Sequence, residues 1–362
     1  MKRIITLLLL ICLVLCACGQ SNNESTTPPT TTEATTNATT EPTTEPTEPP
    51  MLYQNPLTGE PMAELYTSRP VAIVINNIKA CMPQYGISKA DMIYEVETEG
   101  GITRLLAIFS SFDDVGSIGP VRSARTYFSN ISASYDLPLV HCGGSQAALA
   151  QKYDLNNKLS KWDHIDQRFN GAYFYRDKDR KAQGYAYEHT LFTTGESMLN
   201  AVAKKKYDTV YENGVDYGLQ FSDDISLNGT AASKVTITFR GKKTTTMTYN
   251  AETGLYAASQ YGKDHQDAGE NTNLTYKNVL VLQAKQTKAK DNNYTRSYYD
   301  LIGSGKGYFA CNGQMVPIKW TRAKVTDNFS YTLEDGTPLT LGVGTSYVAI
   351  VDTKEPAGIT CK

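Results

Sequence analysis

The stretch "DMIYEVETEGGITRLLAIF" (residues 91–109) carries the pattern on which the fold depends. Apolar residues alternate or run together on both sides of Glu99-Gly100-Gly101, which predicts two strands joined by a turn. Upstream, "VAIVINN" (71–77) is typical of a buried strand, and "LPLVHC" (137–142) downstream is typical of another. This part of the chain therefore contains several strands of one sheet.

Helical patterns follow these strands. "SQAALAQKY" (145–153) reads as a helix, and "ESMLNAVAKKKY" (196–207) places Met198, Leu199 and Val202 on one apolar face. From Ser233 onward, short β-rich runs are separated by turn signals. We therefore expect an α+β protein, with a mixed α/β domain at residues 51–207 and a mainly antiparallel β domain at residues 208–362.

The N-terminus has the pattern of a secreted, lipid-anchored protein. Residues 1–17 combine a basic start with an apolar run, as in a signal peptide, and Leu15-Cys16-Ala17-Cys18 resembles a lipobox. Cys18 would then carry a diacylglyceryl anchor in the outer face of the bacterial cytoplasmic membrane. A plain signal peptide cut nearby is the alternative. Residues 18–50, rich in Thr, Pro and Glu, predict a disordered stalk.

Charge and cysteine content narrow the possible functions. The chain has 35 Lys and Arg against 37 Asp and Glu, which argues against a general nucleic-acid binder. No metal or nucleotide motif is present, so we expect no metal and no cofactor. Disulfides and buried free thiols both remain open. The cysteines concerned are Cys81, Cys142, Cys311 and Cys361.

Two arginines stand out in "GPVRSARTYF" (119–128). Pro120 suits the first position of a helix, which would place Arg122 and Arg125 at its positive end. Arginines there need a counter-charge, and either an anionic ligand or a carboxylate of the 91–109 hairpin could supply it. The core-facing stripe of this helix would comprise Val121, Ala124, Phe128, Ile131 and Tyr135.

The hairpin offers such carboxylates. Glu95, Glu97 and Glu99 share one face of an alternating strand, and Arg104 follows the turn. An outward charged face is ordinarily only solvated, which is the preferred interpretation for Glu97. Glu95, Glu99 and Arg104 gain a functional meaning only if they approach Arg122.

A second polar motif is "HCGGS" (141–145). Gly143 and Gly144 allow close approach of a backbone or ligand, and Ser145 can cap a following helix. The same residues loosely match a hydrolase nucleophile elbow, although the last position is Ala147. His141 and Cys142 are adjacent on a strand and therefore face opposite ways.

The charge run "FYRDKDRKAQGYAYEH" (174–189) adds Arg176, Arg180 and His189. A run of this kind usually forms a solvated loop. Because tyrosines and a histidine flank it, the rim of a pocket is also possible.

Together these segments resemble one family, the YerB-like lipoproteins of Gram-positive bacteria, described as domain of unknown function 3048. The similarity extends over nearly all of residues 51–362 and includes "NPLTGEPM", "IGPVRSAR", "YGKDHQDAG" and "GKGYFACNGQMVPIKW". The resemblance implies no established activity. It does imply a set of recurrent polar positions, although Tyr-Glu-His-Thr replaces the family's usual Ala-Pro-His-Asn around His189. These positions are Asp91, Glu95, Glu99, Arg104, Arg122, Arg125, His141, Ser145, Arg176, Arg180 and His189.

We therefore expect a surface lipoprotein that binds an anionic, envelope-derived ligand in an Arg/His pocket. An envelope hydrolase in the same pocket, with His141, His189 or Glu99 as catalytic group, is one alternative. A non-catalytic adaptor that binds protein partners is the other.

Overall fold

The computed structural model describes residues 53–149, 163–354 and 357–362. The signal peptide, Cys18 and the stalk lie outside the described residues, so these expectations stay predictions. Residues Pro50–Lys362 form one compact unit. In the part that is described, none of the helices has the length and apolar character needed to cross a membrane.

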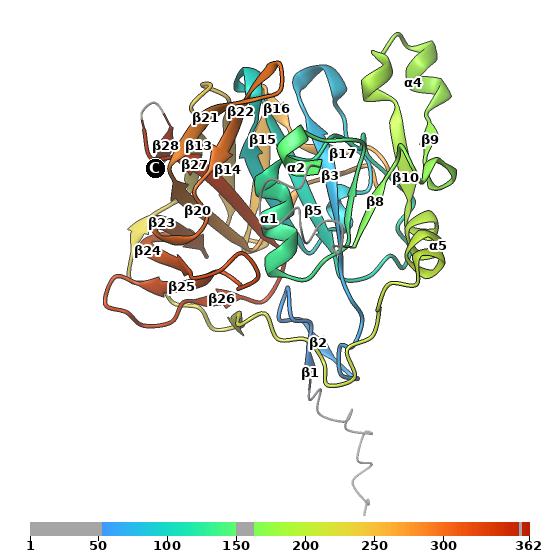
Figure 1. Cartoon of the computed structure of the whole chain (residues 1–362). Coiled ribbons are helices and arrows are strands. Elements are labelled where there is room, and N and C mark those ends of the chain that lie inside the picture. The colour runs from blue at the N-terminus through green and yellow to red at the C-terminus, as the bar shows by residue number, and fades with distance from the viewer. Residues whose placement is uncertain (1–52, 150–162, 355–356) are drawn as a thin grey trace, which may run out of the picture. The chain divides into compact units, whose positions relative to one another are not determined.

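An eleven-stranded mixed sheet runs through this unit (Figure 1). The strand pair expected at 91–109 lies in it as β4 and β5, which are antiparallel, with a 3-10 turn at Glu99–Gly101 between them. Strand β3 pairs antiparallel with β5 over its whole length. In spatial order the strands are β12 (Thr230–Ala231), β24 (Gln314–Arg322), β23 (Gly303–Cys311), β20 (Asn278–Ala284), β27 (Ser346–Asp352), β4 (Met92–Glu97), β5 (Thr103–Phe109), β3 (Val71–Asn77), β7 (Leu139–His141) and β8 (His164–Asp166), while β25 (Ser330–Leu333) pairs with β24.

The predicted boundary at residue 207 does not separate two compact units. Strand β27, from the C-terminal region, pairs in parallel with β4 from the N-terminal region, and β20 pairs with β27 on its other side. Backbone hydrogen bonds therefore continue across the expected boundary, because Met92–Glu97 is a central strand and not an edge.

A second, antiparallel sheet covers one face of the central sheet. It has the order β16 (Lys263–Asp264), β15 (Leu255–Gln260), β14 (Thr244–Asn250), β13 (Lys234–Thr238) and β28 (Gly358–Cys361), with β19 (Thr275–Tyr276) on β15. Val235, Ile237 and Met247 of this sheet share one apolar core with Ile73 and Ile93. Strand β4 is consequently buried on both faces, so Glu95 and Glu97 are inside the protein and the solvated position preferred for Glu97 is wrong.

Helix α1 (Thr126–Ser134) covers the opposite face (Figure 1). Its Phe128 and Ile131 pack with Val74 and Leu106 of the sheet. The predicted stripe from Val121 to Tyr135 is buried throughout. The predicted start at Pro120 is wrong, because residues 121–124 are extended: Val121 pairs with Ile75 in an isolated bridge, and the helix begins after Arg125.

Helices are few and short in the residues that the structure describes, so the fold is mostly β with several sheets, and the α+β description holds only in part. The amphipathic helix forms as α5 (Gly195–Lys205), with Met198 and Val202 buried but Leu199 exposed, contrary to expectation. Among the described residues, the other helices are α2 (Gln146–Leu149), α4 (Lys178–Ala182) and the 3-10 turns Lys79–Cys81, Ile87–Lys89, Glu99–Gly101, Gly171–Tyr173 and Tyr187–His189. The remaining strands are β1 (Tyr53–Gln54), β2 (Pro61–Met62), β6 (Ser117–Ile118), β9 (Tyr175–Arg176), β10 (Leu191–Thr194), β11 (Gln220–Ser222), β17 (Gln266–Asp267), β18 (Thr272–Asn273), β21 (Gln286–Asp291), β22 (Tyr294–Tyr299) and β26 (Thr340–Gly342).

Candidate functional site

A small cavity of about 140 Å³ lies at Arg122, and we call it the Arg122 pocket. Its floor is the extended segment 121–123, which is held on both sides: Arg122 N donates to Val74 O (2.8 Å), and Cys142 N donates to Arg122 O (3.1 Å). Strand β9 and the 3-10 turn Tyr187–His189 close the other side. The lining residues are Val121, Arg122, Ser123, Cys142, Arg176, Tyr187, Glu188 and Leu191.

Arg122 and Arg176 bring two guanidinium groups to this pocket. Arg122 Nη2 lies 3.7 Å from Glu188 Oε1, a carboxylate that is more than half exposed. Arg176 Nη1 donates to Tyr187 O (2.6 Å), and its Cζ lies 3.8 Å from the centre of the Tyr187 ring. The Arg122 Nε is buried and has no hydrogen-bond partner among the described residues. Glu188 therefore offsets the positive charge only in part.

Arg104 lies behind the pocket floor and adds a third positive charge. Its Nη1 donates to Ser123 O (2.5 Å), whereas its buried Nε lacks a partner among the described residues. Burial, together with the positive charges of Arg125 and Arg122, lowers the pKa of Arg104 to about 9. At neutral pH this arginine is still charged and has no carboxylate of its own within salt-bridge distance in the described chain.

Arg125 is neutralised, in contrast to Arg104. Its Nε lies 3.1 Å from both Glu99 oxygens and its Nη2 lies 2.7 Å from Oε2. Arg296 Nη1 also contacts Glu99 (3.3 Å). Burial alone would raise the pKa of Glu99, but the hydrogen bonds and charge of Arg125 outweigh it and the pKa is lowered. Glu99 of the hairpin is therefore the counter-charge of Arg125. The carboxylate that lies near Arg122 is Glu188, which is not part of the hairpin.

His189 lies beside the Arg122 pocket, on the 3-10 turn that also supplies Glu188. Its Nδ1 is 3.0 Å from Asn76 Nδ2, and its Nε2 is 3.9 Å from Glu188 Oε1. Burial lowers the pKa of His189. Arg180, predicted on the same rim, points elsewhere: its Nη1 donates to Cys81 O (2.8 Å) and it packs among three aromatic rings.

The "HCGGS" motif forms a separate cluster. His141 Nδ1 lies 2.8 Å from Gly143 O and Nε2 lies 3.1 Å from His164 Nδ1, while Gly143 N donates to Asp166 Oδ1 (3.0 Å). Burial lowers the pKa of His141 to about 4. Only Cys142, on the other side of the strand, reaches the Arg122 pocket.

Ser145 performs the capping role that the sequence suggests. Its Oγ accepts a hydrogen bond from Ala148 N (3.2 Å) at the start of α2, and its own N donates to Ala124 O (3.3 Å). Gly144 forms an isolated parallel bridge with Ala124. These contacts fix the backbone of the motif against residues 122–125. They explain Ser145 without a nucleophilic role.

Glu95 and Asp91 lie away from the three arginines. Glu95 is buried and contacts Lys243, whereas the Asp91 carboxylate accepts from Ser110 N (2.6 Å) and Ser110 Oγ (2.9 Å) at the other end of β4. Glu188 and Lys243 are functional candidates that sequence reasoning missed. The position of Glu188 next to His189 could have indicated it from the sequence. Nothing in the local sequence distinguishes Lys243 from its neighbour Lys242.

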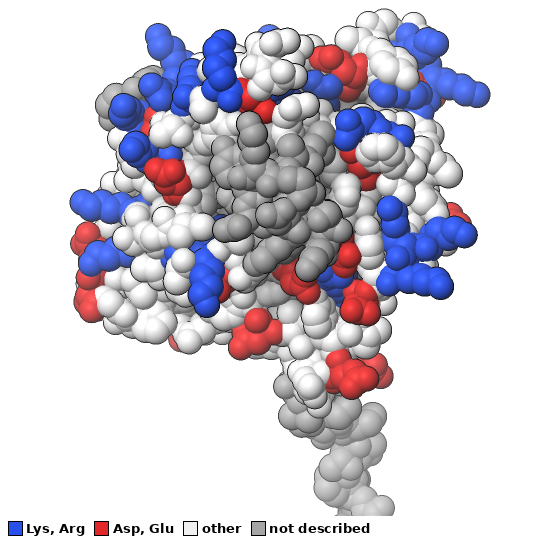
Figure 2. Space-filling model, in the orientation of Figure 1, with Lys and Arg blue, Asp and Glu red and all other residues white. Residues whose placement is uncertain are grey.

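The described residues contain no disulfide. Cys81, Cys142, Cys311 and Cys361 are all free. Within the described ranges, no group of three His, Cys, Asp or Glu side chains is arranged to hold a metal ion. On the face shown in Figure 2, basic side chains lie along the upper, left-hand and right-hand edges with acidic ones among them, so this face carries no single field of one sign.

The chain is similar to known proteins over most of its length. It is 28% identical over 309 residues to "Putative lipoprotein YerB" of Bacillus subtilis (strain 168), which covers 84% of this chain and 88% of the relative. A crystal structure of the YerB protein from Bacillus subtilis superposes with a TM-score of 0.71 at 26% identity, covering 85% of this chain and 99% of that one. Residues 57–208 match the N-terminal domain model, and residues 235–348 the C-terminal domain model, of the protein of unknown function DUF3048. The chain therefore belongs to the DUF3048 family.

Proposed function

We propose that this chain is a lipid-anchored envelope protein that binds a small anionic group, a phosphate or a carboxylate, in the Arg122 pocket. The anchoring part rests on the lipobox at Leu15–Cys18 and on the name of the relative, which calls it a lipoprotein. The Thr/Pro/Glu-rich segment would hold the folded unit away from the outer face of the cytoplasmic membrane.

One observation carries the binding part: Arg122 and Arg104 each bury a guanidinium N–H that no described residue accepts. An unsatisfied buried donor costs roughly 1–3 kcal/mol, more when charged. Two arginines, Arg122 and Arg176, line the pocket, and Arg104 lies behind its floor, while Glu188 is the one carboxylate among the described lining residues. A bound anion would satisfy donors and charge together.

The size of the site suits a small group on a larger molecule. The Arg122 pocket, about 140 Å³, has room for a phosphate or carboxylate. Arg176 also lines a neighbouring open hollow of about 820 Å³, which has room for the rest of an envelope fragment. That hollow carries two aspartates, Asp177 and Asp179, beside its basic residues, so we assign the anionic group to the smaller pocket.

The hydrolase alternative has less support, because its candidate bases are occupied. Glu99 is held by Arg125 and Arg296, and both ring nitrogens of His141 are hydrogen-bonded away from the pocket. His189 alone lies beside the arginines. No contact between the described residues favours the adaptor alternative.

Calorimetric titration of the purified chain with sulfate and with inorganic phosphate tests the proposal. We expect binding of at least one anion, and Arg122→Gln should weaken it tenfold or more. Arg240→Gln is the matched control, because Arg240 pairs with Asp352 outside the pocket. Failure of the wild type to bind either anion, or equal affinity in the Arg122 variant, contradicts the proposal.

A further inference from the structure

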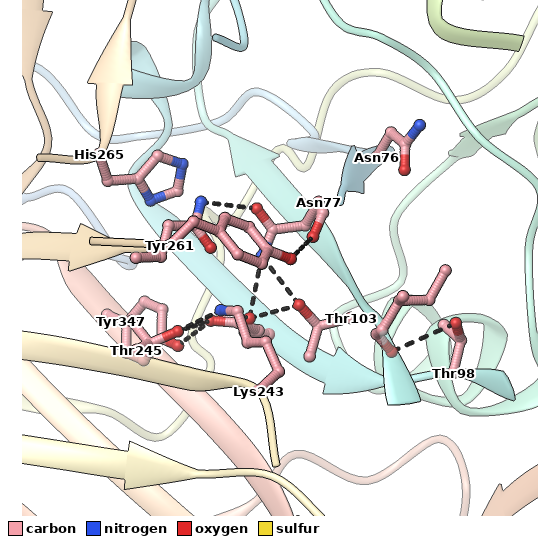
Figure 3. A network of polar contacts seen from close by, with 12 residues as sticks. Asn76, Asn77, Thr98, Thr103, Lys243, Thr245, Tyr261, His265 and Tyr347 are labelled. Atoms are coloured by element: carbon pink, nitrogen blue, oxygen red, sulfur yellow. Dashed lines mark hydrogen bonds and ion pairs between the residues drawn. The ribbon is translucent and has the colours of Figure 1, made fainter. Parts of the chain in front are cut away.

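A closed polar cluster lies between the two large sheets, apart from the Arg122 pocket. The side chains of Asn77, Thr103, Lys243, Thr245 and Tyr347 turn toward one another there (Figure 3). Asn77 ends strand β3 of the central sheet, and Lys243 precedes strand β14 of the second sheet. Contacts within this cluster therefore connect the two sheets.

A single carboxylate oxygen contacts both an amine and an amide. Asn77 Nδ2 donates to Glu95 Oε1 (2.9 Å), and Lys243 Nζ contacts the same oxygen. The other Glu95 oxygen accepts from Thr245 Oγ1 (2.8 Å) and from the Tyr347 hydroxyl. Thr103 Oγ1 also donates to Oε1, so the carboxylate is fixed in orientation, with Oε1 in contact with both Lys243 Nζ and Asn77 Nδ2.

The surroundings of Lys243 favour a nucleophilic amine. Its side chain is 4% exposed and that of Glu95 is 1% exposed. The Nζ atom lies 5.4 Å from the ring centre of Phe239 and 5.7 Å from that of Tyr261. Burial lowers the pKa of Lys243, and the charge of Glu95 only partly offsets this. A neutral amine, unlike an ammonium, has a lone pair with which to attack a carbonyl.

The amide of Asn77 is held as an electrophile. Its Oδ1 accepts from Gln84 Nε2 (2.9 Å) and from Gln260 Nε2 (2.8 Å). Two donors on a carbonyl oxygen polarise the carbon and stabilise the oxyanion formed on attack. Gln84 is itself oriented by His265, whose Nε2 lies 2.9 Å from Gln84 Oε1. Nucleophile, proton carrier and oxyanion donors are therefore present in one water-poor site.

We propose that this cluster forms an intramolecular amide bond between Lys243 Nζ and Asn77 Cγ, with Glu95 as the proton carrier. Lys243 gives a proton to Glu95, and its lone pair attacks Cγ while Oδ1 takes the negative charge. The proton passes from Glu95 to Nδ2, the Cγ–Nδ2 bond breaks, and ammonia leaves. A second proton then passes from Nζ to the released ammonia, which becomes ammonium, and the new amide keeps one N–H. One amide replaces another, so no oxidant or other reactant is needed.

The product would tie strand β3 covalently to the turn that precedes β14. The cross-link would close a long chain segment and hold the two sheets together, which slows global unfolding. Such a link suits a domain exposed outside the cell, where refolding by chaperones is lacking. It is independent of the Arg122 pocket, so either proposal can fail alone.

Tryptic peptide mapping of the full-length protein by mass spectrometry tests this proposal. We expect one branched peptide that joins the Asn77 and Lys243 segments and is lighter by about 17 Da, one ammonia, than the sum of its parts. Trypsin should no longer cut after Lys243. Recovery of both segments only as separate peptides of unmodified mass from folded wild type would overturn the proposal.

Two variants assign the chemistry. Lys243→Met and Glu95→Gln should both give unlinked peptides, and Lys242→Arg, at the exposed neighbouring position, should keep the link. Circular dichroism shows whether each variant is folded. A link that survives Lys243→Met contradicts the assignment of the nucleophile, and one that forms fully in Glu95→Gln contradicts the role of the carboxylate.

Discussion

Arg125 and Glu99 form a bidentate pair, in which Arg125 Nε donates to Glu99 Oε1 (3.1 Å) and Nη2 donates to Oε2 (2.7 Å). Arg125 is the residue directly before α1, and Glu99 lies in the turn between β4 and β5. The pair therefore fixes the start of the helix to the hairpin. The two arginines of the "VRSAR" segment therefore differ in role: Arg125 is held in a structural ion pair, whereas Arg122 lines a cavity.

Loss of Arg125 should destabilise the fold. Because the Arg125 side chain is 6% exposed, Arg125→Ala leaves Glu99 without its main partner. We expect the free energy of unfolding to fall by about 3 kcal/mol, measured by urea denaturation. The double variant Arg125→Ala with Glu99→Ala should lose less than the sum of the single losses, and strict additivity would show that the two groups do not interact.

Acid should remove the contribution of Glu99. Its pKa in the fold lies below the ordinary value of 4.5, so its contribution is complete above that value and disappears as pH falls through the folded pKa. We therefore expect the stability difference between wild type and Glu99→Gln to be constant near neutral pH and to shrink below about pH 4.5. A difference that is independent of pH across this range would be inconsistent with a charged pair.

Anion affinity should fall at alkaline pH because of Arg104. Burial lowers the pKa of Arg104 to about 9, so the pocket loses a positive charge as pH rises through that value. Sulfate is the suitable probe, since its own charge stays constant. We expect its dissociation constant, measured by calorimetry, to rise severalfold between neutral pH and about pH 10 in the wild type. In Arg104→Met the dissociation constant should be higher at every pH and should not rise further at alkaline pH. If it rises in this variant as much as in the wild type, Arg104 is not the source of the change.

Mild acid should destabilise the protein through His141. Its pKa is lowered to about 4, so the unfolded chain binds a proton that the folded chain excludes between the ordinary value of 6.5 and about 4. Stability should therefore fall as pH drops through this window, by about 3 kcal/mol at most from this residue. His141→Gln should show a flatter dependence of unfolding free energy on pH than the wild type. Equal slopes would mean that His141 takes up its proton at the same pH in the folded and unfolded chains.

Substitution of Cys18 tests the anchor. If Cys18 carries the lipid, Cys18→Ala should lower the share of the chain that is recovered with the membrane fraction in a Gram-positive host, because the acyl chains that hold it there are lost. Immunoblotting of fractionated cells measures this. Retention of the variant in the membrane fraction would favour another mode of attachment.

Local sequence predicted the elements whose patterns are self-contained. "VAIVINN" and "MIYEVE" are β3 and β4, the Glu-Gly-Gly segment is the turn, and Ser145 caps its helix. The predicted start of α1 was wrong. Pro120 at the beginning of an apolar pattern has the features of a helix N-terminus, and the prediction relied on them. Tertiary pairing overrides that preference: Val121 bridges to Ile75, and Arg122 N donates to Val74 O.

The sequence alone determined which residues carry charge and which stretches form strands, because alternation and turn residues act over a few positions. Only the tertiary structure decided how those charges pair. Glu95 and Glu99 stand four residues apart, yet Glu99 meets Arg125 and Glu95 meets Lys243, more than a hundred residues away. The reason is that β27 and the second sheet enclose β4, and such long-range packing determines which groups lose water and which partner they find.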